Sequence, residues 1–171
     1  MEVGCFAMQD KFYEYLGDES RPTRQRALTA SSYKNINHSL KDADTNSELA
    51  TYGDALLKLA FCKILFDKDV LIITEEKKKY ESDEVLVKVI AKHYDLLKYI
   101  RFDKTDEKII QNYDYKEPSK PKKPSQSKYI ATAVEALIAA FYLDNKEDFS
   151  VVVEIAKHWK ELIDIDLHYE K

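Results

Sequence analysis

The sequence has little glycine, little proline and few cysteines. Only three of its 171 residues are glycine and four are proline, which disfavours an all-β fold because such folds need many tight turns. The cysteines, Cys5 and Cys62, match no metal-site or redox spacing. No apolar run approaches the roughly 20 residues that span a bilayer, and the first residues lack the pattern of a secretory signal. We therefore expect one cytoplasmic domain over residues 1–171.

The charge of the chain is high but nearly balanced. Charged residues make up 34% of the sequence and the formal net charge is −4, so any nucleic-acid contact must come from a local basic patch. Residues 113–128 hold three of the prolines and five lysines, which predicts an exposed basic loop. The lysines of this patch are Lys116, Lys120, Lys122, Lys123 and Lys128.

Apolar residues recur at helical spacing along most of the chain, and no segment reads convincingly as a strand. Residues 18–24 read as a loop, and a break at Ser82 divides the segment 74–100. The pattern predicts an all-α bundle with helices over residues 5–16, 26–35, 46–66, 74–81, 82–100, 129–144 and 147–165.

Glu135 is unusual because it lies in the apolar segment IATAVEALIAAFYL. It is the only charged residue between Lys128 and Asp144, and a helix this apolar must be largely buried. An ionised carboxylate buried without a partner costs several kcal/mol. Glu135 therefore needs a cation, a metal, hydrogen-bond donors or a proton, and it belongs either to a structural buried pair or to a functional site.

Asp54 follows Gly53 inside the predicted helix 46–66. A glycine costs about 1 kcal/mol in a helix interior, and its usual reason is close helix packing. Asp54 alone reads as a surface residue paired with Lys58, four positions on. Two helices that pack at Gly53 would bring Asp54 close to Glu135, and paired carboxylates suit Mg²⁺ with water and phosphate oxygens as further ligands. The sequence therefore indicates metal-assisted phosphodiester hydrolysis.

Four segments resemble motifs of the ribonuclease III family, and they stand in the family's order over roughly residues 5–165. The segment NSELATYGDALLKLAF resembles the signature helix, and KYIATAVEALIAAFYLD resembles the second acidic motif. ALTASSYKN and YESDEVLVKVIAKHYDLLKYIRF resemble the segments that come before each of these motifs. The resemblance implies the all-α, homodimeric fold of that endonuclease domain.

The resemblance breaks at two of the family's four acidic positions. Asp54 and Glu135 match two of them, whereas Ala50 and Thr132 stand at the other two. One interpretation is a degenerate domain that keeps the fold without cleaving. The other is the short Mini-III branch of enzymes, which looks like Leu-Ala-Tyr-x-Gly-Asp and Thr-Ala-Phe-Glu-Ala-Leu at these motifs. Glu84, however, stands where the longer enzymes have the glutamate of Ser-Asn-Glu.

The resemblance implies cleavage of double-stranded RNA for RNA processing, including rRNA processing, with Mg²⁺ or Mn²⁺ held by Asp54 and Glu135. It also implies that Ala50 and Thr132 line the site, and we expect no separate double-stranded RNA-binding domain. Two alternatives remain open at this point. One is a non-cleaving RNA-binding or ribonucleoprotein scaffold subunit on the same fold, and the other is a helical dimerisation module.

Overall fold

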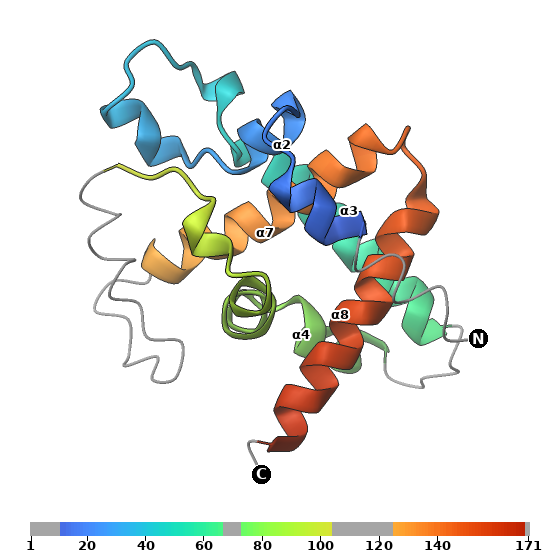
Figure 1. The fold of residues 1–171 in the computed structure, drawn as a ribbon. Helices are drawn as coiled ribbons and strands as arrows, with labels where there is room; N and C mark the ends of the chain where they lie inside the picture. Colours follow the sequence, from blue (N-terminus) through green and yellow to red (C-terminus); the bar gives the residue numbers. More distant parts are fainter. Residues whose placement is uncertain (1–10, 67–72, 104–124, 170–171) are drawn as a thin grey trace.

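A computed structural model describes residues 11–66, 73–103 and 125–169, and it is built of helices (Figure 1). The all-α prediction is confirmed, since extended backbone pairs within these ranges only at one parallel bridge, Thr29 to Arg101. A first helix covers residues 11–17. The elements that follow are α2 (Pro22–Ala27), η1 (Ser31–Asn35), η2 (Asp42–Asp44), α3 (Ser47–Phe66), α4 (Ile73–Glu81), α5 (Asp83–Val85), η3 (Leu86–Ala91), η4 (Leu96–Lys98), α7 (Ser125–Asp144) and α8 (Phe149–Tyr169).

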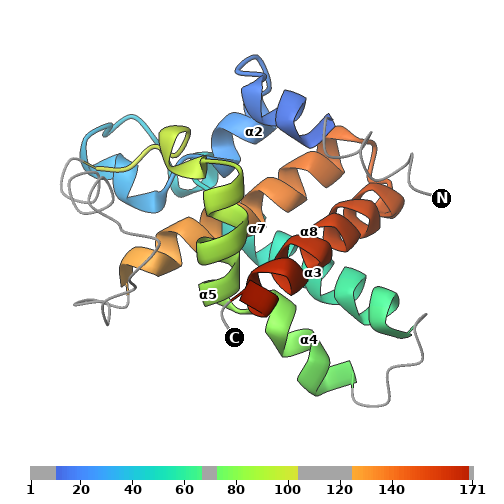
Figure 2. The ribbon, with the colours of Figure 1, turned by 60° about the horizontal axis from the view of Figure 1, so that its bottom comes forward.

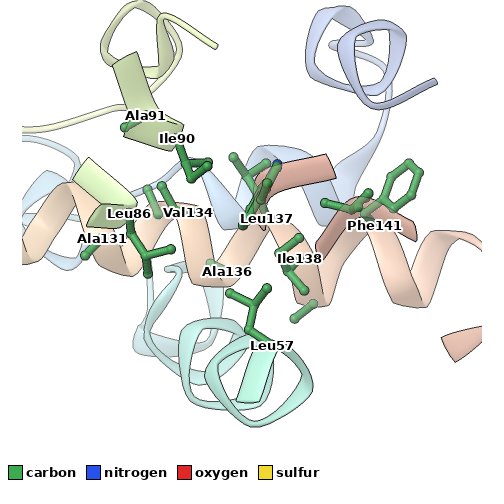
Figure 3. Close-up of a cluster of buried hydrophobic side chains, with 14 of the residues drawn as sticks. Leu57, Leu86, Ile90, Ala91, Ala131, Val134, Ala136, Leu137, Ile138 and Phe141 are labelled. Atoms are coloured by element: carbon green, nitrogen blue, oxygen red, sulfur yellow. The ribbon is translucent and has the colours of Figure 1, made fainter. Parts of the chain in front are cut away.

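The helix α7 forms the centre of the bundle. Its side chains from Ala136 to Ala140 are fully buried, and α2, α3 and η3 all pack against it. Figure 3 shows Leu86 and Ile90 of η3 on one side of α7 and Leu57 of α3 on another. The helix α8 packs across α3 and η3 (Figure 2). An apolar helix such as α7 is stable only when it is surrounded in this way.

An aromatic cluster fills the core near the C-terminal end of α7. The ring of Phe12 lies edge-on to Tyr94 at 5.0 Å, to Phe141 at 5.4 Å and to Trp159 at 6.0 Å between centroids. The Trp159 Nε1–H donates a hydrogen bond to the Tyr94 hydroxyl at 3.2 Å. This cluster ties the helix at residues 11–17 to α7 and α8, and it anchors one end of the central helix.

Two predictions for the N-terminal third of the chain are wrong. The predicted loop 18–24 contains the start of α2, because Pro22 suits the first turn of a helix. The predicted helix 26–35 does not exist as one helix. The Arg101 N–H donates to the Leu28 carbonyl and the Ala30 N–H donates to the Arg101 carbonyl, so the backbone is extended there, before the 3₁₀ helix η1.

The predicted helix 82–100 is wrong as one helix, because α5 and η3 continue only to His93 and a turn at Asp95, with a φ of 49°, separates them from the short 3₁₀ helix η4. Residues 5–10 of the predicted helix 5–16 lie outside the described residues.

The other helices lie close to their predicted positions, with corrected ends. The helix predicted from Asn46 or Ser47 to Phe66 is confirmed as α3. Ser82 caps α5, since its hydroxyl accepts a hydrogen bond from the Val85 N–H at 3.4 Å. The helix α8 begins at Phe149 rather than at residue 147, because Lys146 and Glu147 both have a φ of 59° and form the turn before it.

The predicted basic loop 113–128 is too long at its C-terminal end. No proline follows Pro124 in the sequence, and the backbone of Ser125–Lys128 forms the first turn of α7. Residues 113–124 lie outside the described ranges, and so do Lys116, Lys120, Lys122 and Lys123. In the part of the chain that the structure describes, no helix is both long and apolar enough to cross a membrane.

Candidate active site

The helices α3 and α7 touch backbone to backbone at Gly53. A Cβ atom built on Gly53 would lie 1.8 Å from the carbonyl oxygen of Glu135 and 3.3 Å from the Ala139 nitrogen. No side chain fits there, since a Cβ atom does not approach another heavy atom within 3.0 Å. The glycine therefore fixes how closely α3 approaches the turn of α7 that carries Glu135.

Asp54, the next residue on α3, stands at the edge of this contact. Its side chain is half-exposed and forms an ion pair with Lys58 at 2.7 Å, as the spacing of four residues predicts. The hydrogen bond to Asp54 raises the pKa of Lys58. Exposed pairs of this kind contribute at most about 1 kcal/mol to stability, so the lysine can be displaced by a stronger partner.

Glu135 holds its proton far more strongly than an ordinary glutamate. Burial is the largest cause, followed by the charges of Asp54 and Asp83, and together they raise the pKa of Glu135 to about 7. Lys58 and Lys128 act in the opposite direction. A carboxyl group with a pKa near neutrality beside a second carboxylate is typical of sites that bind a cation or move a proton.

A cleft of about 540 Å³ joins these groups. Five of the site residues predicted from the sequence line this cleft. They are the residues at the family's four acidic positions and the last lysine of the basic segment: Ala50, Asp54, Thr132, Glu135 and Lys128. Ala50 is buried, while Thr132 is half-buried and supplies a hydroxyl in place of a carboxylate. The cleft is therefore lined by two carboxylates of the predicted set, one hydroxyl and one ammonium group.

The side chains that line the cleft fit a hard cation that is bound by only two protein ligands. Within the described residues, no group of three histidine, cysteine or acidic side chains is placed to hold a metal. Mg²⁺ does not need one, because it usually keeps several waters and binds through one or two carboxylates together with substrate phosphates. Asp54 and Glu135 are the pair that would hold it, and a cation between them would offset both the burial and the repulsion that raise the pKa of Glu135.

Two further residues of the cleft were missed by reasoning from the sequence. Asp83 lines it from the first turn of α5, although the sequence marked this residue only as part of a helix start. Asn46 lines it from the residue before α3, although the sequence marked it only as the start of the predicted helix 46–66. The signal for Asp83 was its place in the motif YESDEVLVK; nothing in the sequence shows that α5 faces α7.

The lysine run 77–79 lies on α4 and is neutralised there. Lys77 pairs with Glu81 at 2.7 Å and Lys78 with Glu75 at 3.0 Å, while Lys79 pairs with Glu76. Because each lysine has an acidic partner one turn away, this run presents little net positive charge. Lys128, which lines the cleft, is the better placed cation for a polyanion.

Comparison with known proteins identifies the family. A family model described as the ribonuclease III domain matches residues 47–146, a range that includes Asp54 and Glu135. This chain belongs to the ribonuclease III domain family. The resemblance predicted from the four motifs is thereby confirmed, and the family assignment covers α3, α7 and the elements between them.

Individual relatives agree with this assignment. The chain is 32% identical over 152 residues to a protein named Ribonuclease 3 from Clostridium perfringens, covering 84% of this chain and 55% of that protein. It is 34% identical over 125 residues to Ribonuclease 3 of Clostridium acetobutylicum, covering 71% and 48%. The chain thus spans about half the length of the curated relatives that it matches.

A solved structure shares the fold. The nuclease domain of ribonuclease III from Campylobacter jejuni superimposes with a TM-score of 0.65 at 19% identity, covering 89% of this chain and 96% of that one. Its description refers to structural flexibility in a region involved in dimer formation. At this identity the likeness shows the fold alone.

Proposed function

We propose that this chain is a Mg²⁺-dependent endoribonuclease that cleaves double-stranded RNA. One observation carries the proposal: Asp54 of α3 and Glu135 of α7 line one cleft, where burial first and the charge of Asp54 second raise the pKa of Glu135. Membership of the ribonuclease III domain family supports hydrolysis of an RNA phosphodiester at this pair. Mn²⁺ is the alternative cation, since it accepts the same oxygen ligands.

In this mechanism Asp54 and Glu135 are both the metal ligands and the catalytic residues. Mg²⁺ held by this pair would supply an activated water and would stabilise the charge that develops on the phosphate. Lys58 is paired with Asp54, and it would have to release this carboxylate for Asp54 to act as a ligand. Glu135 would likewise have to give up its proton, because its carboxyl group must be ionised to act as a ligand.

The residues at the replaced acidic positions have smaller roles in the proposal. The Thr132 hydroxyl donates to or accepts from a water in the cleft, and Ala50 leaves room on the face of α3 before Asp54. This arrangement corresponds to an active site of the Mini-III kind, which has fewer carboxylates than the larger family. Two carboxylates then carry the reaction that other members of the family perform with four.

We also propose that the protein acts as a homodimer. Three large apolar side chains lie exposed at intervals of seven residues on α3: Tyr52 is 41% exposed, Leu59 is 56% and Phe66 is 71%. This spacing puts them on one face of the helix, and the Tyr52 ring also lies edge-on to Tyr142 of α7 at 5.8 Å between centroids. An exposed apolar stripe of this size is typical of an interface. The dimer-forming region named for the Campylobacter jejuni nuclease domain supports a second copy of this chain as the partner.

The duplex RNA would contact the basic residues before and in the first turn of α7. Phosphate contacts by lysine give affinity without reading sequence, which suits a shape-specific enzyme. The proposed contacts are Lys116, Lys120, Lys122, Lys123 and Lys128. We propose RNA processing in the cytoplasm, including rRNA processing, as the cellular role.

The proposal is tested by incubating the purified chain with a generic RNA duplex and Mg²⁺. We expect cleavage by the wild type and a loss on the order of 100-fold or more in Asp54→Asn. Glu48→Gln is the matched control, because Glu48 lies on the same helix, outside the cleft, and pairs with Arg26 at 2.5 Å. Absence of Mg²⁺-dependent cleavage by the wild type, across pH and salt, contradicts the proposed activity.

One alternative has an observation in its favour. Ala50 and Thr132 remove two of the family's four acidic positions, and the described residues offer no group of three metal-ligating side chains. A non-cleaving scaffold subunit that binds RNA within a ribonucleoprotein would need neither the two missing acidic residues nor a metal site. Tight duplex binding without cleavage, unchanged in Asp54→Asn, would favour this scaffold over the enzyme.

A further inference from the structure

Asn46 carries a buried hydrogen-bond donor that has no acceptor among the described residues. Its side chain is only 2% exposed, it lines the cleft, and its Nδ2 finds no acceptor anywhere in the described part of the chain. A buried N–H without an acceptor costs about 1–3 kcal/mol. A donor kept in this state at the wall of a cleft points to a ligand that supplies the acceptor.

The backbone holds Asn46 in place independently of this side-chain amide. Its N–H donates to the Thr29 carbonyl at 2.9 Å, and its carbonyl accepts from the Ala50 N–H at 2.8 Å. The residue is therefore fixed on both sides by main-chain hydrogen bonds. The side-chain amide nitrogen takes no part in holding the residue in place.

Asn46, Ala50 and Asp54 follow one another at intervals of four residues, so they lie on one face of α3. The methyl group of Ala50 is too short to fill the space between the other two side chains. The cleft therefore continues from Asp54 to Asn46, a distance of about 12 Å along the helix axis. The two ends of this row are far enough apart to bind different groups of one ligand.

The end of the cleft at Asn46 favours an anion. It lies at the N-terminus of a 20-residue helix, where unpaired N–H groups and the helix dipole attract negative charge. The ammonium group of Lys128 and the hydroxyls of Ser31 and Ser47 also line the cleft. The opposite end holds Asp54 and Glu135, which repel an anion unless a cation lies between them.

We propose that Asn46, the first turn of α3 and Lys128 form a subsite for a backbone phosphate of RNA. The subsite would bind a phosphate neighbouring the one that is placed at Asp54 and Glu135. The proposal rests on the proposed function in one respect, namely that the ligand is RNA. The alanine at position 50 then has a role, because it opens the path between the two phosphate positions.

The test is a binding titration of a generic RNA duplex with the full chain, in EDTA and at low salt, in which fluorescence anisotropy of the labelled duplex reports the affinity. Asn46→Asp keeps the size of the side chain and its oxygen but replaces the donor with a negative charge, and we expect affinity to fall about tenfold or more. Asn37→Asp is the matched control. It makes the same charge change outside the cleft and keeps the oxygen that accepts from Ser39 at 2.7 Å. Its affinity should stay within about twofold of the wild type.

A second readout does not depend on any variant folding. The side-chain amide resonance of Asn46 in the ¹⁵N-labelled wild type should shift when the duplex is added in EDTA. In addition, Lys128→Gln should reduce the slope of log affinity against log salt by roughly 1, close to the value for one lost phosphate contact in B-form DNA. Equal affinities of Asn46→Asp and Asn37→Asp, or an Asn46 amide that the duplex does not move, would overturn the subsite.

The outcomes separate this inference from the proposed activity. A wild type that binds RNA through Asn46 but does not cleave with Mg²⁺ refutes the enzyme and keeps the subsite. A wild type that cleaves while both Asn46 readouts stay unchanged refutes the subsite alone. Failure of the wild type to bind the duplex at low salt, both in EDTA and with Mg²⁺, refutes both.

Discussion

The two ends of α7 are both surrounded by apolar side chains, but they treat polar groups in opposite ways. At the C-terminal end, the Tyr15 hydroxyl donates to Asp144 at 2.9 Å and the Trp159 indole donates to Tyr94. At the cleft end, the Asn46 amide has no acceptor among the described residues, and burial raises the pKa of Glu135. Buried polar groups with partners stabilise the fold, whereas those left over beside a cleft mark where a ligand completes the structure.

His93 shows that a missing partner alone does not make a site. Its Nε2 is buried without a hydrogen-bond partner within the described ranges, near the aromatic end of the core. Burial, together with His158 nearby, lowers the pKa of His93 and keeps the ring neutral. Glu135 differs because it faces a cleft and two other carboxylates, so its ionised form needs a cation.

The largest predicted effect compares two carboxylates on α7 itself. Glu135→Gln should reduce Mg²⁺-dependent RNA cleavage on the order of 100-fold or more, because it removes one of the two metal ligands. Asp144→Asn makes the same chemical change at the other end of the helix. It should leave cleavage unchanged and lower stability by about 1 kcal/mol or less, since the Tyr15 hydroxyl keeps an oxygen acceptor.

Cleavage rates and urea unfolding of the two variants measure this difference. Equal losses of activity in Glu135→Gln and Asp144→Asn would contradict the claim that only the cleft end of α7 takes part in cleavage.

The second effect concerns the close contact that positions Glu135. Gly53→Ala should destabilise the protein by about 3 kcal/mol, because its Cβ would overlap the Glu135 carbonyl, a backbone atom that cannot rotate away. Gly17→Ala is the control, since a Cβ built there meets no atom within 4 Å. Urea denaturation of both variants measures the difference, and a Gly53→Ala protein as stable as Gly17→Ala would contradict the packing described for α3 and α7.

A third prediction follows from the raised pKa of Glu135. Its ordinary value is 4.5, so between pH 4.5 and about 7 the folded protein holds a proton that the unfolded chain has lost. The free energy of unfolding of the metal-free protein should therefore fall as pH rises through this window, and Glu135→Gln should remove that slope.

Metal affinity should change in the opposite direction. Below pH 7 the protonated Glu135 competes with the cation, so Mg²⁺ affinity measured by calorimetry should drop about tenfold for each pH unit. Asp83→Asn removes one of the charges that raise the pKa of Glu135, and it should move this drop to lower pH. A pH-independent Mg²⁺ affinity between pH 5.5 and 8 would exclude Glu135 as a ligand.

The smallest predicted effect tests whether two carboxylates are sufficient for cleavage. Ala50→Glu places a carboxylate one turn before Asp54, where the family resemblance has an acid. We expect the Mg²⁺ concentration for half-maximal cleavage to fall only a few-fold, because two carboxylates with water already suffice for this ion. An increase in cleavage of 100-fold or more would instead indicate that the natural sequence has lost its activity.

The sequence was sufficient for the helices whose apolar pattern is long, and insufficient where distant backbone segments meet. Glu135 and Gly53 were found from the sequence because each breaks a strong local pattern. The extended segment around Thr29 was missed because its partner, Arg101, lies 72 positions away. Asp83 and Asn46 were missed as site residues for the same reason, since each looks like an ordinary residue at a helix start until α5 and α3 are placed beside α7.

The account depends most on a cation between Asp54 and Glu135, and a crystal of the protein grown with Mn²⁺ tests this directly. We predict an anomalous difference peak in the cleft, within about 2.0–2.3 Å of one carboxylate oxygen from each residue, with Lys58 turned away from Asp54. Crystals at millimolar Mn²⁺ and pH 8 that show no peak there, and Lys58 still paired with Asp54, would contradict the proposed metal site.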